Sequence, residues 1–464
     1  MDWPPAGYAG GRIPPAQATP MALVLRAPFF NVTTFDSPLR RCHVNPVQRS
    51  LKWMEPWPRP KSLPDRAWCG WALVGLLVAA CGRSDVAGPA AAPLPTVSVG
   101  AGSACAVDTA GTARCWGANG FGQLGTGSTT GPQQCQGQPC SPVPVAVAGG
   151  LTFTAVSTGA QVACGLTTTG VTYCWGENVV GELGNGTSTG PEACGGGACS
   201  SVPVAISGQV TLKAVSVGSH FACGLTAAGG AFCWGSNNVG QLGVGTATGP
   251  QSCQGNQCSP QPVPVAGRLT FTAISAGGSV ACSVTKAGGA YCWGFGGSGQ
   301  LGDGTTTYSV AAPVAVAGQL VFNSVSAGDR STCGITTSGG AYCWGENSVG
   351  ELGDGTTTGQ QCGGELCRTV PVAVAGGLVF TGVSVGNNFA CGVTTTGAAY
   401  CWGANGVGQL GNGTTTPSAA PVAVAGGLTF AAVSAGNAAA CGVTTAGATY
   451  CWGSGSLVPL RVLP

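Results

Sequence analysis

The residues of this chain that could do the most chemistry are its cysteines, 25 in 464 residues. Cysteines at short, regular spacings can form disulfides or ligate a metal such as zinc. Fourteen stand in seven pairs, in each of which a cysteine precedes a Cys-Trp-Gly tripeptide by ten positions: Cys105 with Cys115, Cys164 with Cys174, Cys223 with Cys233, Cys282 with Cys292, Cys333 with Cys343, Cys391 with Cys401 and Cys441 with Cys451. Eight more form four Cys-x4-Cys pairs: Cys135 with Cys140, Cys194 with Cys199, Cys253 with Cys258 and Cys362 with Cys367. A reducing cytosol rarely holds so many cysteines, so we expect an exported chain, disulfides within these pairs and no metal.

Other catalytic groups are scarce. Catalysis needs a nucleophile with a base, paired carboxylates or a metal cluster. After position 80 the chain has one histidine, His220, and its acidic residues are scattered. We therefore expect no enzyme and no cofactor.

The beginning of the chain has the layout of a targeting segment. Residues 67–80 are apolar and follow three basic residues between positions 59 and 66. This stretch is too short to span a bilayer comfortably, and its layout is typical of a secretory signal. It ends in Val-Ala-Ala-Cys at 78–81, which resembles the lipobox of bacterial lipoproteins. The resemblance implies cleavage before Cys81, lipidation of Cys81 and, because Gly82 follows, sorting to the outer membrane; a plain signal peptide or a fortuitous apolar run is the alternative.

These features predict the organisation of the chain. Residues 1–53 are a disordered extension or a misassigned start, 54–80 a signal peptide beginning at Met54, 81–95 a flexible linker and 96–464 the folded domain. The part after residue 80 carries 8 Lys and Arg against 11 Asp and Glu, a balance of −3, without a basic cluster. Nucleic acids are bound by positively charged surfaces, so we expect no nucleic-acid partner. We expect an exported monomer that touches the membrane only through its lipid anchor.

The cysteine pairs recur every 50 to 59 residues, which indicates one structural unit stacked on copies of itself. The copy at 371–416 holds four short β-type runs, PVAVAG, FTGVSVG, ACGVTT and AAYCWG, separated by glycine-containing turns. Four-stranded antiparallel units repeated radially form a β-propeller. We predict an all-β, seven-bladed β-propeller of four-stranded antiparallel blades, with the tryptophans packed between blades.

The two ends of the repeat region predict how the ring closes. The first copy begins at Thr96 without a PVAVAG-type run, and the chain ends in a run, 456–462, that aligns with residues 141–147. We predict that this C-terminal strand joins the N-terminal blade. The Cys-x4-Cys loops are absent where the repeat is short, so they are expected to be removable surface loops. The last copy also lacks the Asn-x-x-Gly-Gln-Leu-Gly segment.

Six copies carry a Gly-[Gln/Glu]-Leu-Gly element after Trp-Gly, as at 122–125 and 350–353, and in five an asparagine precedes it. The string Trp-Gly-x-Asn-x-x-Gly-Gln-Leu-Gly-x-Gly-Thr resembles the regulator-of-chromosome-condensation repeat family over residues 96–464. The resemblance implies a seven-bladed propeller. The nucleotide-exchange activity of the family's founder is not expected in an exported, disulfide-rich, acidic chain. A secreted bacterial inhibitor of the same fold clamps an enzyme with one propeller face, which makes protein binding the natural analogy.

One propeller face collects the positions that vary between otherwise similar copies. We hypothesise that it binds an unknown protein partner through Gln161, His220, Asp329, Arg330, Asn388, Glu177 and Glu346. The Cys-x4-Cys loops are expected on the same face. Neutral sequence drift at solvent-exposed loop positions explains the variation as well as selection for contact with a partner does. Two other functions stay open: a lectin-like propeller that binds a glycan, for which the variable positions lack a repeated aromatic, and a structural envelope protein.

Overall fold

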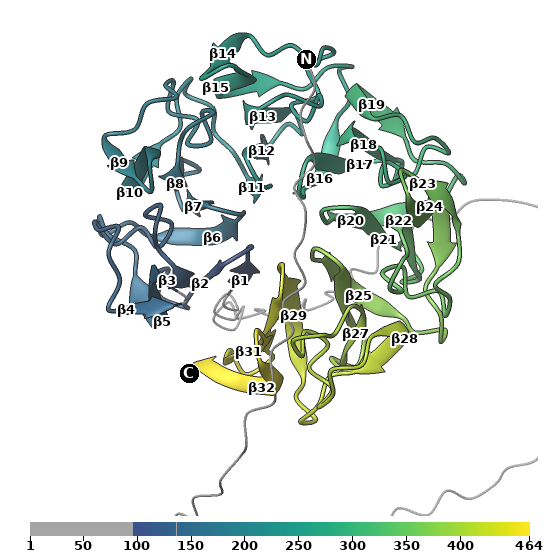
Figure 1. Cartoon of the computed structure of the whole chain (residues 1–464). Helices are drawn as coiled ribbons and strands as arrows, with labels where there is room; N and C mark the ends of the chain where they lie inside the picture. Colours follow the sequence, from purple (N-terminus) through teal and green to yellow (C-terminus); the bar gives the residue numbers. More distant parts are fainter. Residues whose placement is uncertain (1–95, 136) are drawn as a thin grey trace, which may run out of the picture. The chain divides into compact units, whose positions relative to one another are not determined.

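The computed structural model describes residues 96–135 and 137–464, which form a ring of seven antiparallel sheets (Figure 1). All regular elements in this part of the chain are strands, so the predicted all-β, seven-bladed propeller is confirmed. No helix in these residues is long and apolar enough to cross a membrane. Cys81, the predicted signal peptide, the linker and residues 1–53 lie outside the described residues.

Each blade has four main strands, which we describe from the axis of the ring outward. The innermost are β1 (Thr96–Val99), β6 (Phe153–Thr158), β11 (Ala214–Val217), β16 (Phe271–Ala276), β20 (Phe322–Ala327), β25 (Phe380–Val385) and β29 (Phe430–Ala435). The second are β2 (Ser103–Val107), β7 (Val162–Thr167), β12 (Phe221–Leu225), β17 (Val280–Thr285), β21 (Ser331–Thr336), β26 (Phe389–Thr394) and β30 (Ala439–Thr444). The third are β3 (Ala113–Ala118), β8 (Thr172–Glu177), β13 (Ala231–Ser236), β18 (Ala290–Phe295), β22 (Ala341–Glu346), β27 (Ala399–Gly403) and β31 (Thr449–Gly453). The outer strands are β5 (Gln138–Ala146), β10 (Gly197–Ala205), β15 (Asn256–Pro264), β19 (Ser309–Ala315), β24 (Glu365–Ala373), β28 (Ser418–Ala423) and β32 (Ser456–Leu463).

Four blades carry a short fifth strand that the repeat pattern did not predict. These strands are β4 (Gln133–Cys135), β9 (Glu192–Cys194), β14 (Gln251–Cys253) and β23 (Gln360–Cys362), in blades 1, 2, 3 and 5 counted along the chain. Each pairs with the outer strand of its blade as a tight hairpin. A Cys-x4-Cys disulfide joins the two strands in every case: Cys135 with Cys140, Cys194 with Cys199, Cys253 with Cys258 and Cys362 with Cys367. The predicted surface loops are therefore disulfide-bonded hairpins at the rim.

The other seven disulfides lie inside the blades. They join Cys105 with Cys115, Cys164 with Cys174, Cys223 with Cys233, Cys282 with Cys292, Cys333 with Cys343, Cys391 with Cys401 and Cys441 with Cys451. Each links directly opposite residues of the second and third strands, with Cα atoms 4.0–4.1 Å apart. These cysteines are mostly buried, because both strands are covered by the neighbouring blades. All 22 cysteines of the repeats are thus paired as their spacing predicted.

The predicted closing strand is wrong. β32 pairs with β31 of its own blade, with Gly453 opposite Ser456, and not with the N-terminal blade. The PVAVA-type runs are the outer strands of the preceding blades rather than the first strands of the following ones. In blade 7 only two residues separate β31 from β32, so the two strands form a hairpin. Every blade is consequently built from one contiguous segment.

The ring instead closes through a hydrogen bond that recurs at all seven seams. A serine in each innermost strand accepts a bond from a backbone N–H in the innermost strand of the next blade, at 2.9–3.0 Å. The serines are Ser98, Ser157, Ser216, Ser275, Ser326, Ser384 and Ser434. Ser434 of blade 7 bonds Val99 of blade 1, so the two ends of the repeat region meet as any other two blades do.

The outer part of six of the seven seams is filled by tryptophan. In six blades its indole Nε1 donates to the carbonyl of the Gln or Glu in the preceding blade's Gly-[Gln/Glu]-Leu-Gly turn, at 2.9–3.0 Å. The turn must be glycine-rich here: Gly125 has a φ of +68°, and a Cβ would lie 2.9 Å from the ring of Trp175. These six tryptophans are buried, as predicted.

The seam between blades 7 and 1 lacks this filling. Blade 7 has no Gly-Gln-Leu-Gly turn, so Trp116 of blade 1 is only partly buried and its indole makes no hydrogen bond within the described residues. A cavity of about 340 Å³ lies here, lined by Trp116, Trp452 and Leu460 among others. This seam is held at its inner radius and open at its outer radius.

Candidate functional site

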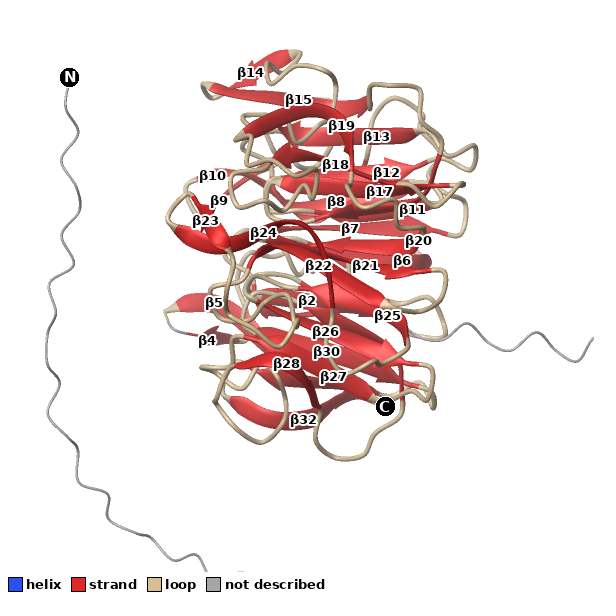
Figure 2. Cartoon of the chain, turned by 90° about the vertical axis from the view of Figure 1, so that its right-hand side faces the viewer, coloured by secondary structure: helices blue, strands red, loops and turns tan. Residues whose placement is uncertain are grey.

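The predicted recognition residues lie at one end of the blades. Gln161, His220, Arg330 and Asn388 each stand immediately before a second strand, and Glu177 ends a third strand as Glu346 does. The antiparallel pairing brings these strand ends together. The fifth-strand hairpins lie on the same side (Figure 2), and the tip of one, Gly195, lines a pocket with Gln161. We call this side the hairpin face.

The centre of the ring is the second feature of this region. A cavity of about 210 Å³ lies there. Its lining includes Asp329 and Asn387, which precede Arg330 and Asn388, and Asn437, the equivalent residue of blade 7. Asn387 Nδ2 donates to Asn437 Oδ1 at 2.8 Å across two blades. The walls are otherwise mainly backbone and small side chains, so the polar groups at this opening come from a few blades only.

Gln161, Glu177, Glu182 and His220 form the first charged group, which we call the His220 cluster. His220 Nδ1 from blade 3 lies 3.3 Å from Glu177 Oε2 and 3.5 Å from Glu182 Oε1, both of blade 2. With its amide oriented by these contacts, Gln161 donates to both oxygens of Glu177, at 2.7 and 3.0 Å. The cluster therefore links two blades, with the carboxylates buried and the imidazole half-exposed.

The titration of this cluster follows from its burial and charge. The nearby carboxylates of Glu177 and Glu182 raise the pKa of His220 to about 10, so the imidazole is cationic at neutral pH when nothing else occupies the site. Burial raises the pKa of Glu182. The cluster thus holds one cation against two buried carboxyl groups.

Asp329, Arg330, Glu346 and Glu351 form the second group, which we call the Arg330 cluster. Arg330 Nη1 donates to Glu346 Oε2 at 3.4 Å, and its Nε lies 4.0 Å from Asp329 Oδ2. Burial raises the pKa of the Asp329 and Glu346 carboxyl groups, against the opposing effect of Arg330. Burial also raises the pKa of Glu351, to about 7.

The two clusters use the same positions in different ways. Gln161 and Arg330 are equivalent residues of blades 2 and 5, and the pair of Glu177 and Glu182 is equivalent to the pair of Glu346 and Glu351. In blade 5 the compensating cation comes from the same blade, whereas in blade 2 it comes from the next blade as His220. Asn388, which takes the place of His220 beside blade 5, is exposed and its side chain makes no hydrogen bond in the described chain.

Sequence reasoning missed three residues of this face. Glu182 and Glu351 belong to the Gly-[Gln/Glu]-Leu-Gly turns, and the glutamate in place of the more common glutamine is the signal by which they could be found. Tyr308 is 67% exposed and packs edge-on against Phe295, with ring centroids 5.0 Å apart. It lies just before β19 in blade 4, where other blades carry the hairpin.

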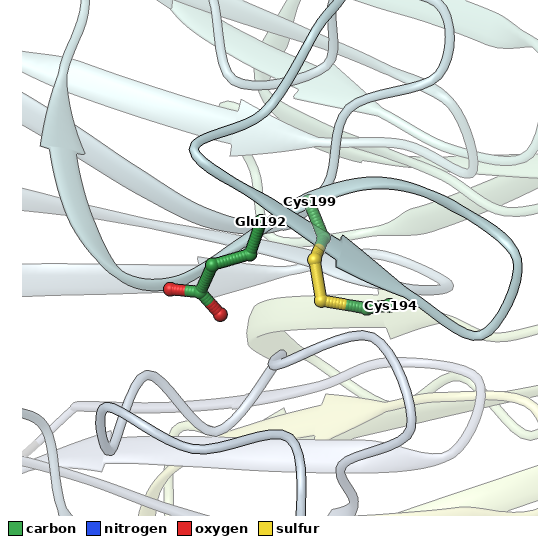
Figure 3. A group of neighbouring side chains, drawn as sticks. All are labelled: Glu192, Cys194 and Cys199. Carbon is green, nitrogen blue, oxygen red and sulfur yellow. A yellow bond between two sulfur atoms is a disulfide. The ribbon is translucent and has the colours of Figure 1, made fainter.

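A third group of ligand-type residues lies on the β9–β10 hairpin. Glu192 stands beside Cys194 and Cys199 (Figure 3). The two sulfurs are bonded to each other, so they offer no thiolate to a metal. Glu192 Oε1 instead accepts a hydrogen bond from Ser201 Oγ at 2.8 Å, which fixes the base of the hairpin.

Comparison with known families agrees with this architecture. One profile described as regulator of chromosome condensation (RCC1) repeat matches residues 96–123, 212–241, 322–351 and 380–409. A second profile of the same description matches residues 111–166, 228–284, 287–335 and 396–443. Together the matched segments cover more than half of the 464 residues.

Among curated proteins, the ultraviolet-B receptor UVR8 of Arabidopsis thaliana is 26% identical over 301 residues, 64% of this chain and 62% of that protein. The probable E3 ubiquitin-protein ligase HERC4 of Mus musculus is 29% identical over 211 residues, 45% of this chain and 19% of that protein. The chain thus spans less than two thirds of the length of either relative.

Solved structures share the fold at low identity. Human WBSCR16 superposes with a TM-score of 0.63 at 19% identity, over 75% of this chain and 93% of that one. Prp20p of Saccharomyces cerevisiae, whose structure is described with its binding to Gsp1p and histones, gives 0.59 at 18% identity, over 74% and 80% of the two chains. At these identities the likeness concerns the fold.

Proposed function

The chain belongs to the regulator of chromosome condensation (RCC1) repeat family, and we propose that it binds another protein with its hairpin face. The observation that carries the proposal is the concentration of charge on that face. Half of the ten Asp and Glu residues between positions 96 and 464 lie in the His220 and Arg330 clusters, although only 7% of the chain is charged. Charges held in buried, hydrogen-bonded positions are suited to orienting a partner.

An aromatic anchor supports the same assignment. Tyr308 extends from the hairpin face of blade 4 and is held by Phe295. Exposed tyrosine and arginine side chains are enriched among the residues that dominate protein–protein binding energy. Arg330 is half-exposed on the adjacent blade. We infer that Tyr308 and Arg330 are the main contacts of the partner, with the His220 cluster at a second site of contact.

We further propose that the propeller is a non-enzymatic, lipid-anchored protein of the cell envelope, tethered through Cys81. The disulfides of the blades suit an oxidising compartment, and the Val-Ala-Ala-Cys motif supplies the anchor. Substitution of Cys81 by serine should then move the protein from the membrane fraction to the soluble envelope fraction. Unchanged membrane association of C81S would contradict lipidation at this residue.

The binding proposal is tested by capture from envelope and secreted fractions with the full oxidised chain as bait. A triple variant, Gln161→Lys, Arg330→Glu and Asn388→Lys, should lose the captured protein, because it changes the charge at three points of the hairpin face. The matched control places charges at Thr169, Ser338 and Thr396, which lie exposed in the same blades on the turns at the opposite strand ends. Equal capture by both triple variants would show that the face is wrongly assigned.

The lectin alternative is separated by a glycan array probed with the same protein. A protein-binding propeller should give no saturable signal, since the hairpin face lacks an aromatic repeated in each blade. Saturable glycan binding that Tyr308→Ala abolishes would favour the lectin function and overturn the proposal.

A further inference from the structure

The His220 cluster has the donors of a metal site. Glu177, Glu182 and His220 each offer a ligand atom, and all these atoms lie within 4.8 Å of one another. Carboxylate oxygen and imidazole nitrogen are ligands that Zn²⁺ and similar divalent ions accept. The side chains converge from two blades, since His220 comes from blade 3 and the glutamates from blade 2.

An unsatisfied buried atom points to a ligand at this place. Glu182 is completely buried, its Oε2 accepts the Val180 N–H at 2.8 Å, and its Oε1 has no hydrogen-bond partner. In blade 3 the equivalent Gln241 makes the corresponding backbone bond and uses its amide Nε2 to reach Ser236 Oγ at 3.1 Å. Glutamate therefore replaces a satisfied amide with an oxygen that faces His220 and lacks a donor.

The distances suit coordination better than hydrogen bonding. Charge-assisted N–H···O bonds are usually about 2.7–2.9 Å long, whereas Nδ1 of His220 lies 3.3 and 3.5 Å from its two oxygens. In a tetrahedral site with bonds of about 2.1 Å, neighbouring ligand atoms are about 3.4 Å apart. The two distances from Nδ1 of His220 match edges of such a tetrahedron, and the third pair of ligand atoms, on the two glutamates, lies within 4.8 Å.

The residues around these three ligands meet the other requirements of a metal site. Gln161 donates to both oxygens of Glu177 and so orients that carboxylate from the outer shell. The His220 side chain is 48% exposed, which leaves an entry path and an open fourth position for water or a partner's ligand. Two carboxylates and a neutral imidazole also balance the charge of one divalent ion.

We propose that Glu177, Glu182 and His220 bind one divalent transition-metal ion, for which zinc is the best match, and thereby join blades 2 and 3. The equivalent place in blades 5 and 6 is not such a site. There Arg330 supplies the cation to Glu346, and Asn388 stands where His220 would be. This assignment does not depend on the protein partner, because its test uses the ion alone.

The test titrates the full oxidised chain, stripped with a chelator, with zinc in a calorimeter. We expect one zinc per chain. His220→Asn, which copies the residue of blade 6, and Glu182→Gln, which copies the residue of four other turns, should each weaken binding by about 100-fold or more. This exceeds the roughly 10- to 100-fold cost of losing an outer-shell partner, which is expected for Gln161→Leu.

Glu351→Gln is the matched control, since it makes the same chemical change in blade 5 and should leave zinc binding unaltered. X-ray absorption at the zinc edge should show nitrogen and oxygen ligands without sulfur. Absence of zinc binding by the unsubstituted chain overturns the proposal. So does equal binding by H220N and E182Q in folded form, or a sulfur ligand in the absorption spectrum.

Discussion

Six turns of this propeller share one side-chain bond, and two of them differ from the rest by a single functional group. The side-chain oxygen of Gln123, Gln241, Gln300 and Gln409 accepts the backbone N–H two residues earlier. Glu182 and Glu351 accept the same bond but leave a second, buried oxygen without a partner. The bond shapes the turn, and the glutamates place a buried carboxyl group on the hairpin face.

The carboxyl group of Glu351 should make stability depend on pH. Its pKa is raised by burial to about 7 in the folded protein, so the neutral form is favoured by folding. Its contribution to stability is fully present below the ordinary pKa of glutamate and is lost as pH rises through 7. Glu351→Gln stays neutral and should raise the free energy of unfolding at pH 8 by about 3 kcal/mol, with little effect at pH 4.5.

Denaturant unfolding at pH 4.5, 6.5 and 8 with the disulfides intact measures this difference. Asp108→Asn, at a partly exposed position of blade 1, is the control and should follow the unsubstituted protein. A gain from E351Q that is the same at all three pH values would show that the carboxyl group is not responsible.

At the scale of the element, the two kinds of disulfide have different tasks. The bond between Cys223 and Cys233 joins two central strands inside blade 3, whereas the bond between Cys253 and Cys258 joins the rim hairpin β14–β15 of the same blade. The central strands are covered on both faces by other blades, so disorder in these strands should destabilise the neighbouring blades as well. A hairpin at the rim can instead open locally, without unfolding the rest of its blade.

We therefore expect Cys223→Ala with Cys233→Ala to lower the free energy of unfolding of the whole propeller by about 2–3 kcal/mol. Cys253→Ala with Cys258→Ala should leave the main thermal transition nearly unchanged and make the hairpin susceptible to a protease. Thermal melting and limited proteolysis of the two double variants measure both effects. Equal shifts of the main transition would indicate that the hairpins are part of the cooperative core.

At the scale of the whole molecule, the seam between blades 7 and 1 is the point of least packing. It keeps the serine bond from Ser434 to Val99, but it lacks the turn that covers the tryptophan at the other six seams. Because the molecule is a closed ring, the loss of one seam exposes the faces of two blades. We expect the ring to open here first when it unfolds.

Filling the seam should stabilise the ring. Residues 404–417 of blade 6, which contain the missing type of turn, can replace Ser454 and Gly455 in blade 7. The graft buries Trp116 and an added leucine, which should contribute about 2–4 kcal/mol, raise the thermal midpoint and shift tryptophan emission to the blue. Slower amide exchange in β1 and β29 locates the effect. A graft in which the leucine is replaced by serine is the control, and an equal gain from it would contradict seam filling.

Much of this molecule follows from residues that are close in sequence. The number of blades, the strand runs and the disulfide pairs were predicted correctly, because cysteines ten or five positions apart meet across a single hairpin. The predicted recognition residues share one face for the same reason, since chain direction decides at which end of an antiparallel blade each strand begins. The glutamates of two turns are visible in the sequence, but the burial of their carboxyl groups is not, because it depends on the neighbouring blade.

Tertiary structure decided what depends on contacts between blades. The prediction that a PVAVA-type run begins a blade was wrong, because both pairings keep the same order of strands along the chain and only the packing decides between them. The serines that close the ring, the uncovered Trp116 and the meeting of His220 with two glutamates of the neighbouring blade arise only when seven sheets pack around an axis. Short hairpins are encoded locally, whereas the approach of one blade to another is fixed by radial packing, which no single repeat contains.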